Sequence, residues 1–275
     1  MSPFRASPRF TDRWEHFRFA VDGGVATVTF ARPEKLNALT FEVYADLRDL
    51  LAELPHRGDA RVLVIAGEGR GFCSGGDVEE IIGALQRMEP AELLEFTRMT
   101  GAVVKALREC PLPVVAAVNG VAAGAGSVIA LAADFRLLAS SASFAFLFTR
   151  VGLAGADMGS AYLLPRVVGL GRATELLMLG DKVDAERAVA LGLASEVVDD
   201  EALPERAAAL ARRLADGPAF AYSTTKVLLT RELDMPLGSA IELEAMTQAL
   251  LMRSHDHREF YRAWSEGRQP AWAGR

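Results

Sequence analysis

Residues that supply nucleophiles and metal ligands are scarce in this chain of 275 residues. It has two cysteines, Cys73 and Cys110, and four histidines. Two cysteines are too few for the disulfide framework of a secreted domain, so we expect the reducing environment of the cytoplasm. No histidines, cysteines and acidic residues share the spacing of metal ligands, so we expect no metal site. All four histidines lie outside residues 110–156, which disfavours a serine or cysteine nucleophile activated by histidine there.

A surplus of positive charge and an unbroken hydrophobic run are also missing. The net charge is −6, whereas a general nucleic-acid binder needs a basic face, so we expect no nucleic-acid partner. The longest apolar run, Val114–Ala133, is interrupted by Asn119 and three glycines, which predicts a strand, a loop and a buried helix rather than a membrane span. The segment Met1–Thr11 has no apolar stretch as long as a secretory signal needs. We therefore expect no membrane association.

Apolar residues, 51% of the chain, are arranged as alternating strands and helices for about two hundred residues. The β-branched segment Val25–Phe30 predicts a strand, as do the apolar runs Val62–Ala66 and Val114–Val118. Between the first two, Phe41–Leu54 has apolar residues at helical spacing, and Thr40 is placed to cap that helix.

Only helices are predicted beyond residue 200, over residues 203–214, 220–231 and 237–253. We therefore expect a mixed α/β (α+β) fold in two parts. Residues 1–200 would form a core that carries the functional site, and residues 201–275 would form a helical region.

Two glycine-rich segments each follow a predicted strand and precede a predicted helix. The first runs from Val62 to Asp77 and the second from Val114 to Leu131. Such a junction leaves backbone N–H groups unpaired at the positive end of the helix dipole, and glycine lets a ligand approach them. Two turns that face one pocket would donate two hydrogen bonds to one oxygen, which is how enzymes stabilise the enolate of a thioester.

Other interpretations fit a single turn of this kind. Each turn taken alone is equally compatible with an ordinary αβ connection that binds nothing. A phosphate-binding loop fits less well, because neither turn has a lysine followed by serine or threonine after its last glycine.

Four sequence motifs occur in a fixed order: Arg32–Leu39, Phe72–Asp77, Ala117–Gly126 and Leu163–Gly169. In this order they resemble the signature segments of the crotonase, or enoyl-CoA hydratase/isomerase, family. The resemblance covers roughly residues 25–268 and continues through the stretch Ala185–Val198.

This resemblance implies a fold, an assembly and a binding site. The fold is the crotonase spiral of repeated ββα units, and the C-terminal helices build a homotrimer or a homohexamer and close over CoA. The substrate is an acyl-CoA thioester, with no further cofactor. The implied oxyanion donors are the amides of Gly76 and Ala125. The residues implied to contact the substrate or its CoA are Lys35, Leu36, Ala38, Ser74, Gly75, Asp77, Gly124, Phe148, Trp264 and Arg268.

The acid/base groups depart from the family pattern. The two glutamates of the best-known hydratases fall here on Val128 and on Phe148 or, with a different gap, Thr149, and none of these acts as an acid or base. Within residues 110–156 the only carboxylate is Asp134, which follows a predicted helix and is interpreted as structural. Asp157 lies in a small, apolar loop, where desolvation would raise the pKa of its carboxyl and suit a general base.

Asp157 supports several interpretations. As a structural residue it would cap a helix over Gly159–Val168. As a catalytic residue it resembles the lone aspartate of the family's isomerases and the nucleophile of a dehalogenase branch. One carboxylate suffices to move a double bond, whereas hydration usually needs a second group, so isomerisation is favoured. Hydration with an unidentified second group, thioester hydrolysis, decarboxylation, dehalogenation and a non-catalytic acyl-CoA-binding role stay open, as do the acyl chain and the pathway.

Overall fold

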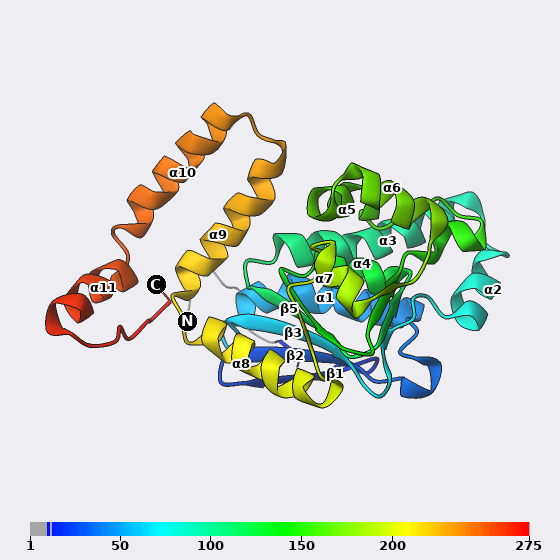
Figure 1. The fold of residues 1–275 in the computed structure, drawn as a ribbon, viewed down its shortest axis with the longest axis horizontal. Coiled ribbons are helices and arrows are strands. Elements are labelled where there is room, and N and C mark those ends of the chain that lie inside the picture. Colours follow the sequence, from blue (N-terminus) through cyan, green and yellow to red (C-terminus); the bar gives the residue numbers. More distant parts are fainter. Residues whose placement is uncertain (1–9, 12, 275) are drawn as a thin grey trace.

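A computed structural model describes residues 10–11 and 13–274 and arranges them as two β-sheets surrounded by helices (Figure 1). The strands are β1 (Arg18–Asp22), β2 (Val25–Phe30), β3 (Val62–Gly67), β4 (Gly71–Cys73), β5 (Val114–Val118), β6 (Val121–Ala123), β7 (Phe135–Ala139), β8 (Ser143–Ala145), β9 (Val183–Asp184) and β10 (Glu196–Val198). The α-helices are α1 (Phe41–Arg57), α2 (Gly83–Leu85), α3 (Pro90–Glu109), α4 (Ala125–Ala132), α5 (Ser160–Val168), α6 (Leu170–Leu179), α7 (Ala185–Ala190), α8 (Leu203–Ala215), α9 (Ala219–Arg231), α10 (Leu237–Leu251) and α11 (His255–Glu266). Shorter turns are the 3-10 segments η1 (Pro33–Lys35), η3 (Leu147–Val151), η4 (Asp200–Ala202) and η5 (Glu232–Asp234), and the π-helical turn η2 (Val78–Ile82).

The two sheets are built by consecutive units of strand, strand and helix. The larger sheet has the order β1-β2-β3-β5-β7-β10, and the smaller sheet has the order β4-β6-β8-β9. Pairing is parallel except between β1 and β2 and between β8 and β9. β3, β5 and β7 enter the larger sheet, while β4, β6 and β8, which follow them, enter the smaller one. This repeated ββα arrangement confirms the fold class expected from the sequence.

The core lies between the sheets and the helices that cover them. All five residues of β5 are buried, as expected for an apolar parallel strand with both faces covered. On one face of the larger sheet, α8 packs against β2, β3, β5 and β7. The rings of Phe30 on β2 and Phe72 on β4 meet edge-on, with centroids 5.9 Å apart, and so join the two sheets. Thr40 caps α1 as predicted, accepting a hydrogen bond from the Val43 amide.

The glycine-rich segments differ from the simple strand-to-helix turns expected from the sequence. Each contains an additional three-residue strand, β4 in the first and β6 in the second, and these two strands pair in parallel. The first segment then passes through Gly75 and Gly76 into η2, which Asp77 caps. The second leads directly into α4, whose N-cap Gly124 provides no capping side chain. Three-residue strands of mostly small residues carry too little periodicity to be predicted.

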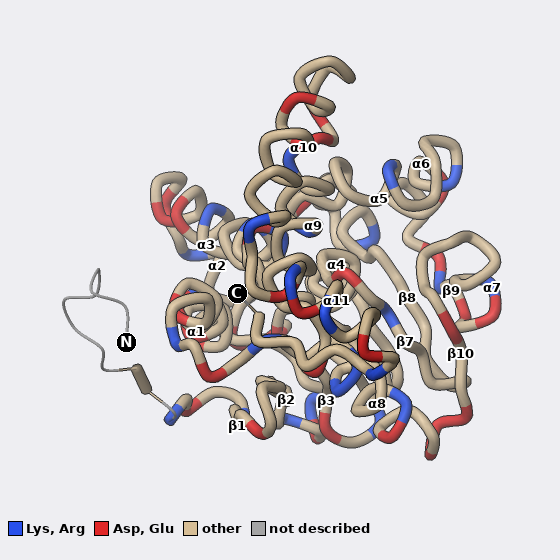
Figure 2. Tube along the Cα trace, turned by 90° about the vertical axis from the view of Figure 1, so that its left-hand side faces the viewer, with Lys and Arg blue, Asp and Glu red and all other residues tan. Residues whose placement is uncertain are grey.

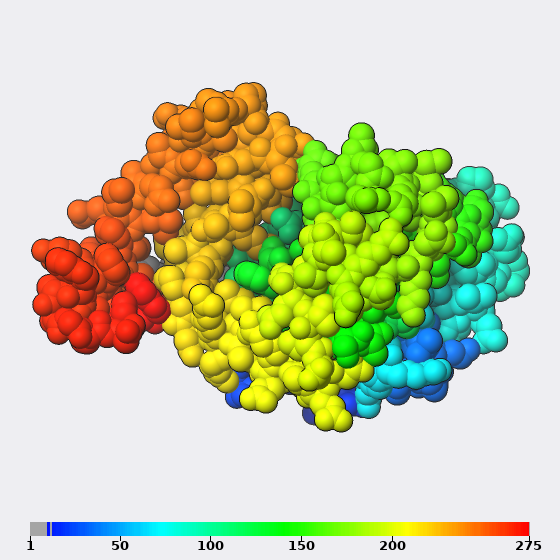
Figure 3. Space-filling view, viewed as in Figure 1, coloured from blue at the N-terminus to red at the C-terminus, as the bar shows by residue number. Residues whose placement is uncertain are grey.

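The last three helices, α9 to α11, form an arm over residues 219–274 that projects from the body of the molecule (Figure 1). The predicted helices over residues 203–214, 220–231 and 237–253 agree closely with α8, α9 and α10. α8 packs on the larger sheet, so the arm begins at α9, and the division at residue 200 stays a prediction. Figure 3 shows the surface hollowed between α9 and the green helices α5 and α6. A cavity of about 400 Å³ is lined by residues of α3, α5 and α9.

Charged residues of both signs are interspersed along the trace (Figure 2). Over the described part of the chain, no helix combines the length and the apolar character that crossing a bilayer requires. The expectations about nucleic acids and cellular location stay predictions, and the segment Met1–Thr11 lies largely outside the described residues.

Candidate active site

The motif Arg32–Leu39 runs along the first glycine-rich turn and is hydrogen-bonded to it. The Leu39 amide donates to the Gly75 carbonyl (2.8 Å), and the Asp77 amide donates to the Leu39 carbonyl (2.9 Å). The Ser74 amide donates to the Leu36 carbonyl (3.0 Å). The structure thus brings together, at one junction, the predicted residues Lys35, Leu36, Ala38, Ser74, Gly75 and Asp77.

Two asparagine side chains hold this junction in place. Asn37 is 1% exposed, and its Nδ2 donates to the carbonyls of Gly71 (2.7 Å) and Glu68 (2.9 Å). Asn119, from the second glycine-rich segment, donates to the Gly69 carbonyl (2.8 Å) and accepts from the Gly67 amide (3.2 Å). Sequence reasoning did not single out either side chain, although both lie inside the motifs. Their side chains replace the backbone partners that an irregular, buried loop lacks.

The two glycine-rich turns are in direct contact. A Cβ atom added to Gly75 would lie 3.0 Å from the Ala123 carbonyl oxygen and 3.5 Å from the Ala125 nitrogen. Gly75 has φ +99° and Gly124 has φ +50°, in a backbone region that residues other than glycine rarely adopt. Any side chain at Gly75 would therefore crowd the turn that carries Ala125.

The amides of Gly76 and Ala125 lie at this contact without acceptors. Among the residues that the structure describes, neither N–H donates a hydrogen bond. Ala125 is the first residue of α4, so its amide lies at the positive end of the helix dipole. Ser127 anchors this end of α4, because its hydroxyl lies 2.7 Å from the Ala122 carbonyl and 3.0 Å from that of Ala145. That both amides bind one oxygen stays a prediction.

Asp157 is half-buried in the loop between η3 and α5. Its Oδ1 accepts a hydrogen bond from the adjacent Met158 amide (2.8 Å). Burial raises the pKa of the Asp157 carboxyl above its ordinary value of 3.8, and the Met158 hydrogen bond opposes this only in part. The alternative interpretation of Asp157 as a helix cap is wrong, because the N-cap of α5 is Gly159 and no side chain caps that helix. Backbone turns at Met158 (φ +51°) and Gly159 (φ +88°) separate the Asp157 carboxylate from the start of α5.

Tyr44, in the first turn of α1, is a buried phenol whose pKa is affected by Cys73 in the first glycine-rich turn and by Asp157. Burial raises the pKa of the Tyr44 phenol well above its usual range, and the acidic groups of Cys73 and Asp157 raise it further. That Asp157 lies beside the Gly76 and Ala125 amides stays a prediction. The sequence does not single out Tyr44, which is one of several apolar residues at helical spacing in α1. Burial also raises the pKa of the Cys73 thiol to about 12, so Cys73 stays protonated and is not a nucleophile at neutral pH.

Strained backbone marks the same region. Among the described residues, the non-glycine residues with positive φ are Leu36, Asn37 and Met158. Two lie in the segment paired with the first turn, and the third follows Asp157. Such conformations persist only where the surroundings impose them, and they concentrate at functional sites.

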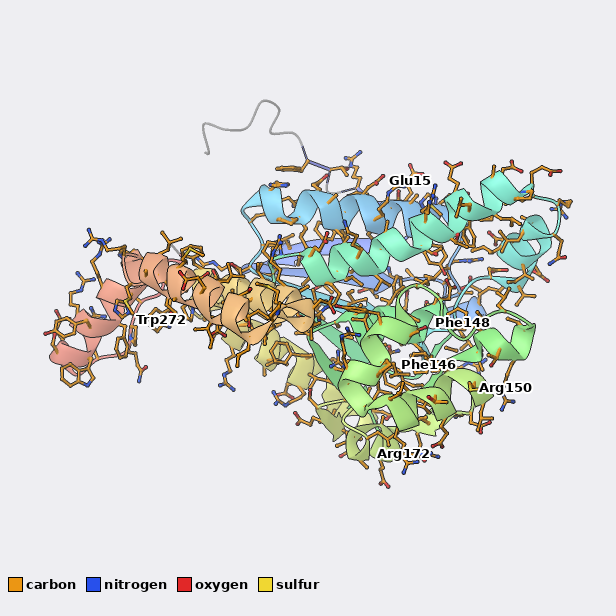
Figure 4. The ribbon with its side chains drawn as sticks, turned by 90° about the horizontal axis from the view of Figure 1, so that it is seen from above. Glu15, Phe146, Phe148, Arg150, Arg172 and Trp272 are labelled. Carbon is orange, nitrogen blue, oxygen red and sulfur yellow. The ribbon has the colours of Figure 1, made fainter. Side chains whose placement is uncertain are left out.

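The predicted residues of the C-terminal helix lie elsewhere in this single chain. Trp264 is 70% exposed on α11, and the Arg268 guanidinium pairs with Glu259 (2.6 Å) and Glu266 (2.5 Å). In Figure 4, Trp272 at the end of the arm is far from Phe148, which is buried in the body of the molecule. A contact of Trp264 or Arg268 with substrate therefore requires a second subunit, and it stays a prediction.

Two other aspartates have structural partners. Asp134 accepts from the Val114 amide (2.8 Å) and pairs with Lys226 (2.8 Å) and Arg108 (3.2 Å), in agreement with its structural interpretation. Asp77 is 3% exposed and caps η2. Within the described residues, no three histidines, cysteines or acidic side chains gather as a metal site requires, and the absence of a metal stays a prediction.

Comparisons with known proteins identify the family. A model of the family described as enoyl-CoA hydratase/isomerase matches residues 20–275. The chain belongs to this family, the crotonase superfamily. It is therefore an enzyme of the hydratase/isomerase family, and an acyl-CoA substrate is consistent with this membership.

Individual members of the family resemble the chain over nearly its whole length. The 1,2-epoxyphenylacetyl-CoA isomerase of Escherichia coli K12 is 38% identical, over 93% of this chain and 97% of its own. A Rhodobacter capsulatus protein, named as an inferred enoyl-CoA hydratase, is 40% identical over 94% of this chain and 98% of its own. A crystal structure from Streptomyces coelicolor A3(2), also named as an inferred enoyl-CoA hydratase, is 65% identical, covers 100% of both chains and has a TM-score of 0.98.

Proposed function

We propose that this enzyme moves the double bond of an unsaturated acyl-CoA thioester, with Asp157 as its acid/base. The observation that carries the proposal is the combination of two unpartnered amides, on Gly76 and Ala125, with one desolvated carboxylate, that of Asp157. The Escherichia coli relative is itself named an isomerase of an acyl-CoA.

The mechanism needs no group beyond these three. The thioester oxygen accepts hydrogen bonds from both amides, which acidifies the protons on the carbons conjugated with it. Ionised Asp157 removes a proton from one carbon, and the electron pair spreads over the dienolate that the amides stabilise. Protonated Asp157 then returns the proton to another carbon, so the double bond moves and no water is consumed.

CoA would bind along the junction of Arg32–Leu39 with the first turn, where Lys35 is partly exposed. We propose that the enzyme is a homotrimer or homohexamer in which Trp264 and Arg268 reach the CoA of a neighbouring subunit. The exposed apolar residues of the arm support this, because they have no partner surface within one chain. The substrate supplies its own CoA, and no other cofactor is invoked.

Hydration is the second candidate. The Thr149 hydroxyl is fully enclosed and lacks a hydrogen-bond partner among the described residues. Thr149 is also one of the two positions onto which the second glutamate of hydratases falls. A hydroxyl there could orient a water molecule, and the Rhodobacter capsulatus relative carries a hydratase name.

One assay separates the two reactions. Enoyl-CoA isomers are incubated in water labelled with deuterium and ¹⁸O, and the products are analysed by mass spectrometry. Isomerisation predicts a moved double bond, with deuterium but no ¹⁸O in the product. Incorporation of ¹⁸O on carbon would replace isomerisation with hydration.

The amide pair can be tested by removing one donor. Ala125→Pro eliminates the N–H at that position, and losing one oxyanion donor lowers kcat by about 10²–10³-fold. Ala125→Gly retains the N–H and serves as the matched control, with activity close to that of the parent. Equal activity in both variants would exclude the Ala125 amide from the mechanism.

A further inference from the structure

Ser160, three residues after Asp157, is a buried serine that the proposed mechanism does not use. Its side chain is 0% exposed, and although it is the first residue of α5, no side chain caps that helix. Its hydroxyl instead donates to the Gly155 carbonyl (3.0 Å) and accepts from the Asp157 amide (3.1 Å). The hydroxyl of Ser160 therefore holds the preceding loop rather than its own helix.

The loop fixes three of the four polar atoms of Asp157. The amide is bonded to the Ser160 hydroxyl, the carbonyl accepts from the Ser160 amide (2.8 Å), and Oδ1 accepts from the Met158 amide (2.8 Å). The remaining atom, Oδ2, accepts no hydrogen bond from any described residue. It is also not one of the fully enclosed atoms that lack a partner, so it is accessible from outside. Oδ2 is thus the atom of Asp157 that is left to exchange a proton.

The Ser160 hydroxyl connects Asp157 to a fixed point in the body of the molecule. Gly155 lies so close to α6 that a Cβ atom on it would overlap the Leu177 carbonyl oxygen. Met158, on the other side of Asp157, is 6% exposed and has φ +51°, a conformation that persists only where the surroundings impose it. Without the hydroxyl, the Asp157 amide loses its acceptor and its link to Gly155.

We propose that Ser160 is a positioning residue, which holds Asp157 so that Oδ2 exchanges protons with the substrate. This inference rests on the proposed function for the role of Asp157. Both hydrogen bonds of the Ser160 hydroxyl lie within the loop, so the residue acts through Asp157 and not on the substrate. A base that is fixed before the substrate binds needs no ordering during the reaction.

Steady-state kinetics of Ser160→Ala, with the enoyl-CoA on which the parent is most active, test the role. We expect kcat to fall by about 10- to 100-fold with KM nearly unchanged, since a misplacement of about 1 Å costs on the order of 100-fold. Ser160→Thr keeps the hydroxyl and should retain most of the parent kcat. Ser143→Ala is the matched control, because it removes another buried hydroxyl, on β8, and should leave kcat unchanged.

A double variant separates positioning from a general structural role. In an Asp157→Asn background, Ser160→Ala should cause no further loss of kcat, because no base remains to be positioned. A further loss as large as that in the parent background would overturn the inference, since Ser160 would then act independently of Asp157.

Carbon-13 NMR of the Asp157 carboxyl provides a readout that needs no turnover. Burial raises the pKa of this carboxyl in the parent, and in Ser160→Ala the released side chain should reach more water, so its pKa should fall toward 3.8. If both kcat and this pKa stay unchanged in Ser160→Ala, the inference is wrong. A lowered pKa together with full activity of Asp157→Asn would keep the positioning role and refute the proposed function alone.

A second variant covers the case in which Ser160→Ala does not fold. Ser160→Cys has a similar size but a thiol that forms weaker hydrogen bonds, so it should show the same changes in kcat and pKa at smaller magnitude. Parent values of both quantities in Ser160→Cys would then contradict the positioning role.

Discussion

Helix α4 of the core and helix α10 of the C-terminal arm differ in how far their apolar side chains are buried. All eight residues of α4 in the core are buried, whereas Leu237 and Leu250 on α10 of the arm are 75% and 71% exposed. α4 buries its apolar surface within one chain, and α10 does not. α10 thus exposes apolar surface of the kind that marks interaction sites, which supports the proposed assembly, whereas α4 needs no further partner for its side chains.

The junction between these regions contains a buried charge. Lys226 is the one described residue of α9 that is buried. Its Nζ donates to the carbonyls of Leu107 and Leu112, each at 2.9 Å, and pairs with Asp134 at 2.8 Å. A buried cation therefore anchors the arm to the core.

The largest effect is expected from a change in the core that leaves the arm intact. Asp157→Asn removes proton affinity at nearly constant size and should lower kcat by about 10²–10⁴-fold, with assembly and CoA binding unchanged. Steady-state kinetics and sedimentation measure both. Asp184→Asn is the matched control, because Asp184 caps α7 and asparagine caps about as well. Near-full activity of Asp157→Asn would remove Asp157 from the mechanism.

Substitutions in the arm are expected to change assembly without altering Asp157 or the two amides. Replacing Ile241 and Leu250 of α10 by glutamate would place charge where we expect a partner surface, and it should convert the oligomer to monomer. Sedimentation velocity at micromolar concentration tests this. Leu94→Glu, at a position 49% exposed on α3, should leave assembly unchanged. A parent protein that is already monomeric would contradict the proposed assembly.

A smaller effect, on the stability of the fold, is expected from a change where α9 joins the core. Lys226→Met removes one partner of a buried ion pair and should lower the free energy of unfolding by about 3–5 kcal/mol. Chemical denaturation followed by circular dichroism gives the change. Lys182→Met, at an exposed position, should have almost no effect. An equally small loss for both variants would show that charge does not anchor the arm.

The smallest effect concerns pH. Because burial raises the pKa of Asp157, the folded protein binds that proton more tightly than the unfolded chain does. Stability is therefore lost as pH rises from the ordinary value of 3.8 through the raised pKa, and Asp157→Asn should increase Tm slightly at neutral pH. The acid limb of kcat/KM should lie above pH 3.8, since only ionised Asp157 acts as a base. A lower Tm for the variant would mean that the Asp157 charge stabilises the fold.

Regular patterns in the sequence predicted the regular parts of the fold. The buried strand Val114–Val118 has the predicted bounds, and Thr40 caps the predicted helix. No helix was predicted for α3, because only Thr100, Val103, Val104 and Leu107 among its 20 residues are buried. The strands of the smaller sheet are too short to show a period.

The candidate site was predictable where it lies in continuous motifs. The glycine-rich turns and Asp157 could be chosen from local sequence, since small residues and an isolated carboxylate are visible there. The roles of Asn37 and Asn119 depend on segments that meet only after folding. Asp157 does not cap α5 because the backbone turns at Met158, which has a positive φ. Residue preferences do not predict a positive φ at a methionine.

The most direct test of the account is a crystal structure of Asp157→Asn with 3-hexenoyl-CoA bound. We expect the thioester oxygen to lie within about 3.2 Å of both the Gly76 and Ala125 nitrogens, with the side chain at position 157 beside the carbons that exchange protons. A thioester oxygen bound to other donors, or an acyl chain remote from position 157, would contradict it.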